Sequence, residues 1–224
     1  MKRARLHSSA FLGAALSSCV ASAPTDVEVV RAYRLYGWHR CDAVLDQVKS
    51  IDFSGEGEKR EPFFRLLQGY CTELEGDTAA AKELYSSVIS NAPRTTQAFE
   101  AALRLRELER LERLGLTRVK QKLQSEQARS SPLYRHVVQP IQRSEPKYPS
   151  AMVAAKVKGW VVVDFEIARN GSVVDPVVVD SDPPFVFDGA ALAAMQHWVY
   201  ESSNEDEPIR AVVRLNFDIV QHYQ

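Results

Sequence analysis

Side chains that commonly bind metals or perform catalysis are present in this chain, but their spacing does not form a site. The 224 residues include 5 histidines, which are scattered singly with no pair at the separation of metal ligands. Those histidines are His7, His39, His136, His197 and His222. A glycine-rich phosphate loop, a nucleophile elbow and an HExxH motif are all absent from the sequence. We therefore expect no catalytic residue, no metal ion and no cofactor, and we predict that the protein is not an enzyme.

Two groups of carboxylates do not change this expectation. Asp164 and Glu166 alternate with apolar residues, so we expect both on the solvent-facing side of one strand, where no cleft makes them an acid–base pair. The run Glu205-Asp206-Glu207 follows no regular pattern and is expected to be a solvated loop.

Composition is typical of a globular protein with one large or two small domains. Hydrophobic residues make up 45% of the chain and charged residues 25%, with a formal net charge of −1. Because no segment carries a strong excess of basic residues, we expect no nucleic-acid partner.

The first residues have the organisation of an export signal. The basic residues Lys2, Arg3 and Arg5 precede an apolar run over 10–16. That run is much shorter than the roughly 20 residues that span a bilayer, but it suits the apolar region of a secretory signal.

The end of this signal has three interpretations. Leu16-Ser17-Ser18-Cys19 resembles the bacterial lipoprotein signal, in which cleavage after residue 18 leaves a lipid-modified cysteine. The resemblance implies lipidation of Cys19, a tether over 19–25 and a periplasmic location on the outer membrane of a Gram-negative bacterium, since Val20 and not Asp follows the cysteine. The alternatives are simple secretion after Ala21-Ser22-Ala23, which Pro24 disfavours, and a retained inner-membrane signal anchor.

Residues 26–116 are predicted to form helices. Val29, Ala32, Tyr33 and Tyr36 repeat at helical spacing, and a loop with Gly55 and Gly57 precedes the next helix. Residues 62–93 resemble a tetratricopeptide repeat, the helix–turn–helix unit of about 34 residues. The matching positions are Gly69, Gly76-Asp77, Ala81, Tyr85, Val88 and Pro93. This module is either a helical spacer or a peptide-binding groove.

The chain from 117 to 138 is predicted to be a helical, charged linker. The charged run Arg104–Arg129 is expected to be solvated, with contact to anionic lipid or cell-wall polymer as the alternative. Ser130-Ser131-Pro132 marks the boundary with the next domain.

Cys41 and Cys71 form an even pair once Cys19 is assigned to lipid. An exported protein is expected to oxidise such a pair, and the resulting disulfide would stabilise the fold by roughly 3–4 kcal/mol. Two buried thiols that never meet are the alternative.

Residues 139–224 are predicted to be a strand-rich domain. Residues 160–168 alternate apolar and polar side chains, and Asn170-Gly171 is a strong signal for a two-residue hairpin turn with both residues at positive φ. A second strand over 172–181 is expected at a sheet edge or bulged at Pro176. Asp182-Pro183-Pro184 is predicted to start a helix, and 209–220 to form the third strand.

This strand–strand–helix–strand order over 139–222 resembles the TonB C-terminal domain family. The residues that carry the resemblance are Tyr148-Pro149-Ser150-Ala151, Gly159, Val161, Val163, Phe165, Asn170-Gly171, Val173, Ser181, Pro183, Phe187, Ala190-Ala191, Trp198 and Tyr200. Together with the preceding helices, the resemblance implies an α+β fold in which a helical tetratricopeptide-like module is followed by a small β-β-α-β domain with an antiparallel sheet.

The family resemblance also implies a function and partners. Family members carry energy from the ExbB–ExbD motor to outer-membrane transporters, and they bind the transporter's extended box peptide as an added strand. The implied partner-binding residues are Glu145, Tyr148 and Pro149 before the first strand, and Arg210, Val212, Arg214 and Asn216 on the third strand. The third strand could also pair with a second copy to give a homodimer.

Departures from the family pattern leave a second function open. The short signal and the absence of a long proline-rich spacer do not fit motor coupling, and Glu145 stands where the best-known member has glutamine. The alternative is an outer-membrane lipoprotein that scaffolds an envelope complex without using the proton-motive force.

The lipoprotein interpretation makes a direct prediction. Cys19→Ala should abolish incorporation of radiolabelled palmitate and move the protein from the membrane to the soluble fraction, because the acyl chains provide the anchor. A Cys19→Ala protein still held in membranes would refute the lipid anchor.

Overall fold

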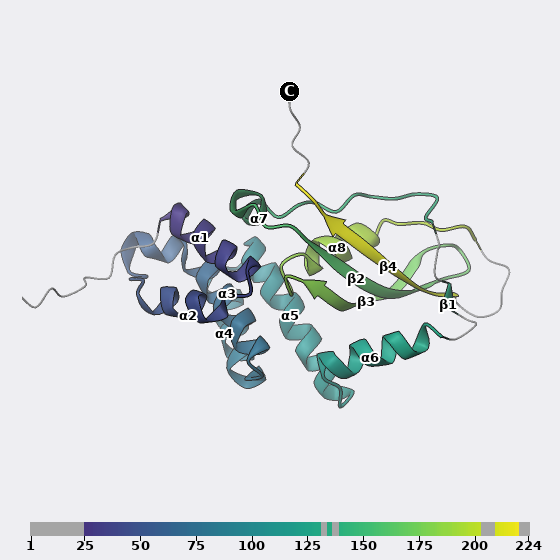
Figure 1. Cartoon of the computed structure of the whole chain (residues 1–224), viewed down its shortest axis with the longest axis horizontal. Helices are drawn as coiled ribbons and strands as arrows, with labels where there is room; N and C mark the ends of the chain where they lie inside the picture. The colour runs from purple at the N-terminus through teal and green to yellow at the C-terminus, as the bar shows by residue number, and fades with distance from the viewer. Residues whose placement is uncertain (1–24, 131–133, 136–138, 203–208, 220–224) are drawn as a thin grey trace, which may run out of the picture.

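A computed structural model describes residues 25–130, 134–135, 139–202 and 209–219. Helices α1–α5, here called the helical module, lie at one end of the molecule, and a four-stranded sheet lies at the other (Figure 1). This arrangement confirms the predicted α+β fold, with helices first and a β-β-α-β unit after them. The signal, Cys19 and most of the tether lie outside the described residues.

The first two helices follow from their apolar spacing and from local capping. Helix α1 (Asp26–Gly37) begins with a capping box, in which the Thr25 side chain accepts from the Glu28 backbone and the Glu28 carboxylate accepts from the Thr25 backbone. Its predicted apolar stripe is buried throughout. Helix α2 (Cys41–Lys49) follows, and the short 3₁₀ helix η1 (Gly55–Lys59) precedes α3.

Helices α3 (Glu61–Leu74) and α4 (Thr78–Asn91) pack closely because Gly69 has no side chain. A Cβ atom at Gly69 would lie 2.5 Å from the ring of Tyr85. The Asp77 side chain accepts from the Ala80 backbone N–H and caps α4.

A disulfide joins Cys41 of α2 to Cys71 of α3 across a sequence separation of 30 residues. It ties the first helix pair to the second. Its neighbour Tyr70 is buried and lies against Tyr36 and Tyr85, so an aromatic cluster fills the space between α1, α3 and α4.

The prediction of a solvated charged run is wrong at Arg104. Helix α5 (Thr96–Arg113) buries Arg104, which pairs with the equally buried Glu73 of α3. Helix α6 (Arg118–Ala128) also buries two of its side chains, Gln121 and Ser125. A local polar pattern cannot predict these buried positions, because the burial of each polar side chain depends on a hydrogen-bond or ion-pair partner that is distant in the sequence.

The sheet has the strand order β1-β4-β2-β3. Strand β2 (Gly159–Ile167) is antiparallel both to β3 (Val173–Asp182) and to β4 (Ile209–Phe217). Strand β3 forms one edge of the sheet, and its register with β2 shifts twice, as the proline within it predicted.

The hairpin between β2 and β3 differs from the predicted two-residue turn. Gly171 has a φ of +82°, but Asn170 is not at positive φ. Backbone hydrogen bonds Ala168 N–H to Ser172 O and Gly171 N–H to Ala168 O close a three-residue loop instead. A Cβ at Gly171 would lie 2.0 Å from the Tyr200 carbonyl oxygen, so glycine is required there.

The predicted helix start at Asp182-Pro183-Pro184 is wrong. Strand β3 extends to Asp182, which is opposite Trp160, and helix α8 (Asp188–Met195) begins only after Phe187. The intervening turn buries the Phe185 side chain, at 1% exposure and a φ of +72°. Burial of the Phe185 ring therefore determines the path of the chain here, and the helix does not begin at the capping sequence Asp182-Pro183-Pro184.

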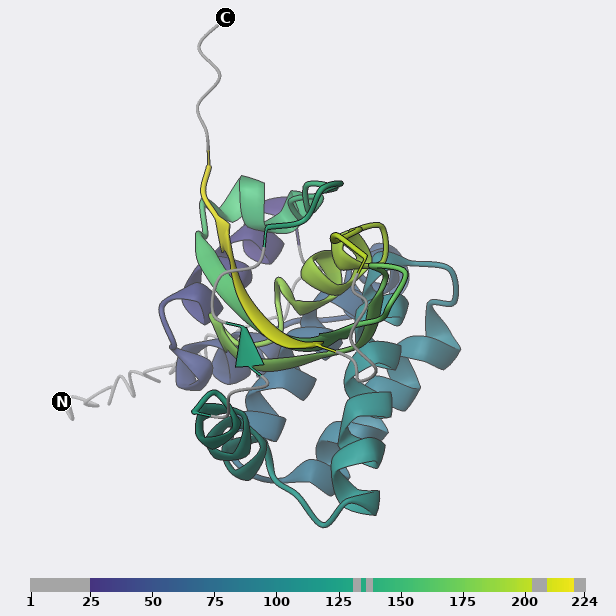
Figure 2. The same cartoon turned by 90° about the vertical axis from the view of Figure 1, so that its right-hand side faces the viewer.

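Helices cover both faces of the sheet (Figure 2). Helix α8 lies on the face formed by Val161, Val163 and Phe165, while α6 lies on the opposite face. The prediction that Asp164 faces solvent is wrong, because Asp164 is 4% exposed and accepts a 2.6 Å hydrogen bond from Ser125 of α6. Helix α7 (Ser150–Ala155) contacts α1 at the junction of the two halves.

Phe185 is the centre of the contact between the helical module and the sheet. The guanidinium carbons of Arg104 and Arg118 lie 4.0 and 4.4 Å from its ring centroid, and the Tyr70 ring lies 5.3 Å away. Around it, Arg118 donates to the Ser181 hydroxyl at 2.9 Å, and the Tyr36 hydroxyl donates to the Pro184 carbonyl at 3.1 Å.

Removal of this ring should loosen the contact. We expect Phe185→Ala to lower the free energy of unfolding by ~3–5 kcal/mol, because it leaves a cavity beside the buried Arg104 and the partly buried Arg118 guanidinium groups. Phe99→Ala is the matched control, since the Phe99 side chain is 53% exposed and should contribute less than ~1 kcal/mol. Urea unfolding of both variants measures the difference, and equal losses would contradict the assigned role of Phe185.

Candidate functional site

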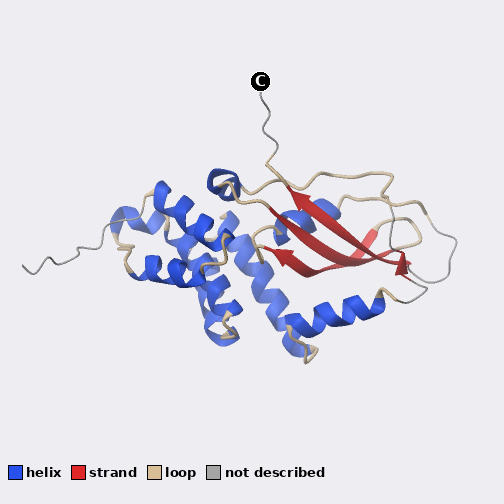
Figure 3. Cartoon of the chain, in the orientation of Figure 1, coloured by secondary structure: helices blue, strands red, loops and turns tan. Residues whose placement is uncertain are grey.

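The outer edge of β4 offers unpaired backbone groups. Strand β2 pairs with β4 along its whole length, from Gly159 opposite Phe217 to Ile167 opposite Ile209. On the other side, β1 (Tyr134–Arg135) pairs in parallel with Arg210 and Ala211 only. Among the described residues, no strand pairs with the outer edge of β4 from 212 to 217 (Figure 3). Exposed edge groups of this kind can pair with another extended chain.

Four predicted partner-binding residues lie on the α6 side of this edge. Arg210, Val212, Arg214 and Asn216 are opposite Glu166, Asp164, Val162 and Trp160, so their side chains share one face of the sheet.

Their contacts on this face differ. Arg210 donates to Asp164 at 3.0 Å and is anchored at the start of β4. The Arg214 guanidinium lies 4.3 Å from the Trp160 ring centroid and donates to Asn216 at 3.2 Å. Trp160 is a neighbour that the sequence did not assign to the site, although its place on the alternating strand indicates this face.

Tyr148 and Pro149 lie on the opposite, α8 side of the edge. The Tyr148 hydroxyl donates to the Val157 carbonyl at 2.5 Å, and its ring lies against Phe187 and Phe217 at 5.5 and 5.9 Å. Partial burial raises the pKa of Tyr148, so its hydroxyl stays protonated and can donate. Pro149 directly precedes α7 and has an extended backbone.

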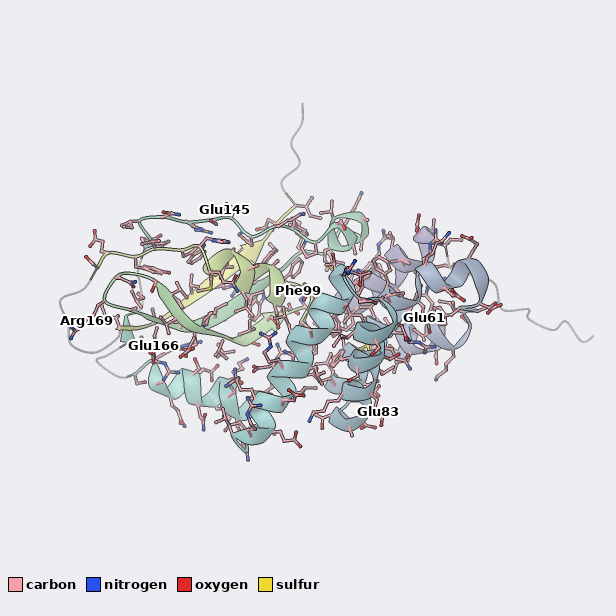
Figure 4. All side chains as sticks on the ribbon, turned by 180° about the vertical axis from the view of Figure 1, so that it is seen from behind. Glu61, Glu83, Phe99, Glu145, Glu166 and Arg169 are labelled. Atoms are coloured by element: carbon pink, nitrogen blue, oxygen red, sulfur yellow. A yellow bond between two sulfur atoms is a disulfide. The ribbon has the colours of Figure 1, made fainter. Side chains whose placement is uncertain are left out.

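Glu145 lies in the extended segment before Tyr148 and points into solvent (Figure 4). Its carboxylate forms an exposed ion pair with Arg143 at 3.2 Å. This segment is held by two backbone hydrogen bonds between Gln142 and Val199 and by the Trp198 indole, which donates to the Ser144 carbonyl at 2.8 Å. The segment therefore runs along the chain that leaves α8.

The residues predicted on β4 and Tyr148 thus flank one strand from two faces, whereas Glu145 lies on the segment beside the chain that leaves α8, and they do not meet in a single pocket. Backbone donors and acceptors at this edge suit recognition of an extended peptide, with side chains on either face available to contact it. In the described ranges, nowhere do three or more His, Cys, Asp or Glu side chains gather as a metal site. Over the same ranges, no helix has the length and apolar character of a membrane span.

This architecture is that of a small antiparallel sheet domain with an exposed edge strand. Residues 144–219 match the sequence model of the family described as Gram-negative bacterial TonB protein C-terminal. The match covers β2, β3, α8 and β4, and it supports the family resemblance of this part of the chain. The predicted tetratricopeptide character and lipoprotein signal stay predictions.

Individual relatives are similar over the same region. Protein TonB of Escherichia coli (strain K12) is 29% identical over 79 residues, which are 35% of this chain and 32% of that protein. Protein TonB of Salmonella typhimurium (strain LT2) is 27% identical over 78 residues, 34% of this chain and 32% of that protein. The chain therefore spans about a third of the length of the curated relatives that it matches.

Among solved structures, the solution NMR structure of the Pseudomonas aeruginosa TonB CTD is similar. It is 29% identical with a TM-score of 0.32, and the alignment covers 37% of this chain and 86% of that one.

The contacts of Tyr148 predict how much this residue contributes to the free energy of unfolding. Tyr148→Phe should lower the free energy of unfolding by about 1 kcal/mol, because it loses one hydrogen bond and keeps both ring contacts. Tyr148→Ala should cost ~3 kcal/mol or more because the ring contacts are lost too. Urea unfolding measures both values, and equal losses would show that the ring contacts contribute nothing.

Proposed function

We propose that this protein binds an extended peptide as an added strand along residues 212–217 of β4. The supporting observation is that β2 pairs with all of β4 while β1 pairs with only its first residues, so the remaining outer edge is open among the described residues. This edge is about 20 Å long at roughly 3.3 Å per residue, enough for a peptide of about six residues. The parallel β1 pairing further supports the idea that the edge accepts a parallel strand.

The two flanks of the edge would read the side chains of the bound peptide. Successive peptide side chains alternate between faces, so one set would meet Arg214 and Asn216 and the other the region of Tyr148 and Phe217. The exposed Arg214 favours an acidic or polar residue in the peptide, whereas the aromatic flank favours an apolar residue.

The family match supports a specific class of peptide. We infer that the partner is the box segment of an outer-membrane TonB-dependent transporter, and that the protein acts in the periplasm in energy-dependent transport across the outer membrane. Coupling to an ExbB–ExbD motor and a lipid anchor on Cys19 belong to the same proposal. A homodimer through β4 would use the same edge and would compete with the peptide.

A second candidate function is scaffolding of an envelope complex by a lipoprotein that is not coupled to the proton-motive force. The observation that favours it is the packing of the helical module onto the sheet through Phe185 and buried Arg104. A module held in this way is suited to present a fixed surface to other envelope proteins. Co-purification of transporters and motor proteins would favour the first function, and co-purification of other envelope proteins the second.

Proline substitution tests strand addition directly. Backbone N–H groups alternate between the two edges of a strand, so the N–H groups of Val212 and Val213 point in opposite directions. Proline at one of these positions removes a donor from the outer edge, and proline at the other removes a hydrogen bond to β2. The variant with the smaller loss of thermal stability should be the outward one, and it should bind a transporter box peptide at least tenfold more weakly by isothermal titration calorimetry.

Val174→Ala is the matched control because it shortens a partly exposed side chain of β3, at the other edge of the sheet, and leaves the backbone donors of β4 unchanged. Its dissociation constant should change less than about threefold, since main-chain pairing supplies most of the affinity. Retained peptide binding by both proline variants would refute docking at this edge.

A further inference from the structure

A groove separates the helical module from the C-terminal unit at the side of Tyr148. It has a volume of about 410 Å³, which is within the size range of ligand sites. Its aromatic lining comes from α1, α3, α5 and the segment before α7, with Tyr33, Tyr70, Phe99 and Tyr148 contributing rings. Phe99 lies at the solvent side, 53% exposed, on the part of α5 that is labelled in Figure 4.

Glu100 lies in this groove without a partner. Its carboxylate makes no hydrogen bond or ion pair with any residue in the described part of the chain. The carboxylate packs against Gly189 at the start of α8 and occupies the space of the missing side chain, since a Cβ there would be 2.6 Å from both carboxylate oxygens. A partly buried carboxyl that borders a groove and has no hydrogen-bond partner within the protein does not stabilise the fold, so its presence needs another explanation.

The surroundings of Glu100 explain its protonation. The pKa of Glu100 is raised to about 8, mainly by burial and in part by the nearby Asp188 of α8, while Arg104 of α5 opposes the shift. Tyr33 and Tyr70 face it from α1 and α3, and Lys147 lines the groove with an exposed side chain. Arg104 is already paired with Glu73, and no other cation of the described residues forms an ion pair with Glu100.

We propose that this groove binds a basic side chain, arginine or lysine, carried by an extended segment of a protein partner, with Glu100 as its counter-ion and the aromatic rings around its apolar stem. The cation would satisfy the carboxylate, and aromatic faces attract guanidinium and ammonium groups. The groove volume admits such a side chain together with one neighbouring apolar residue. This groove is distinct from the outer edge of β4, although Tyr148 borders both, and its occupation does not require strand addition there.

The probe for the test is acetyl-Phe-Arg-amide, and acetyl-Phe-citrulline-amide is its uncharged counterpart of the same shape. Titration into the ¹⁵N-labelled full chain should shift the amide signals of Gly189 and Ala190, which line the groove beside Glu100. We expect the arginine peptide to bind at least tenfold more tightly than the citrulline peptide at pH 8.5.

The pH dependence gives an independent readout. Because binding of a cation requires the ionised carboxylate, affinity for the arginine peptide should rise roughly tenfold per pH unit below pH 8 and level off above it. The arginine side chain stays charged throughout this range. Citrulline-peptide affinity should not change with pH.

Variants complete the test. Glu100→Gln should weaken arginine-peptide binding at pH 8.5 at least tenfold and remove its pH dependence, whereas Glu83→Gln, on an exposed carboxyl of α4, should change neither (Figure 4). Lys147→Met should strengthen binding, since it removes a like charge from the groove. Equal binding of the two peptides to the unmodified chain would overturn the proposal whether or not Glu100→Gln folds, and so would unchanged binding by a folded Glu100→Gln protein.

Discussion

The contact of Phe185 with Arg104 and Arg118 holds the two halves of this protein together. Arg104 can be buried there because Glu73 neutralises it, and Glu73 also accepts a 2.8 Å hydrogen bond from Tyr85. Breaking one member of such a buried pair leaves an uncompensated charge, which is costly. The helices, the Phe185 turn and the sheet are therefore coupled, and the orientation of β4 relative to the helical module depends on them.

The sheet is covered on both faces, and one of the covering helices, α6, lies outside the β-β-α-β unit. Helix α8 covers one face, as in a simple two-layer α+β unit. Helix α6 covers part of the other through Ser125 to Asp164 and Gln121 to the Val178 carbonyl at 3.0 Å. Both faces are thus partly closed, and the strand edges without a strand neighbour among the described residues are those of β3 and of β4 from 212 to 217. The proposed peptide site and the groove at Glu100 are distinct sites that both border Tyr148.

Some errors of sequence interpretation have a common physical cause. Arg104 and Asp164 are charged residues in polar patterns, so burial was not expected, yet each is buried against a partner far away in the chain. Asp182-Pro183-Pro184 has the local chemistry of a helix start, but the burial of Phe185 delays the helix to Asp188. At Asn170 the local turn preference yielded to a three-residue loop that brings Gly171 against the Tyr200 backbone. Long-range contacts decided the outcome in every case.

The sequence by itself determined the elements and their order. The apolar spacing of Val29, Ala32, Tyr33 and Tyr36 and the approximate alternation over β2 and β4 are periodicities that each segment carries locally. The tertiary structure alone decided which edge of the sheet stays open, which charged residues are buried, and that Glu100 lies in a groove between the two halves. These features depend on contacts between residues distant in sequence, and a local pattern contains no information about the partner that satisfies a buried charge or covers a strand.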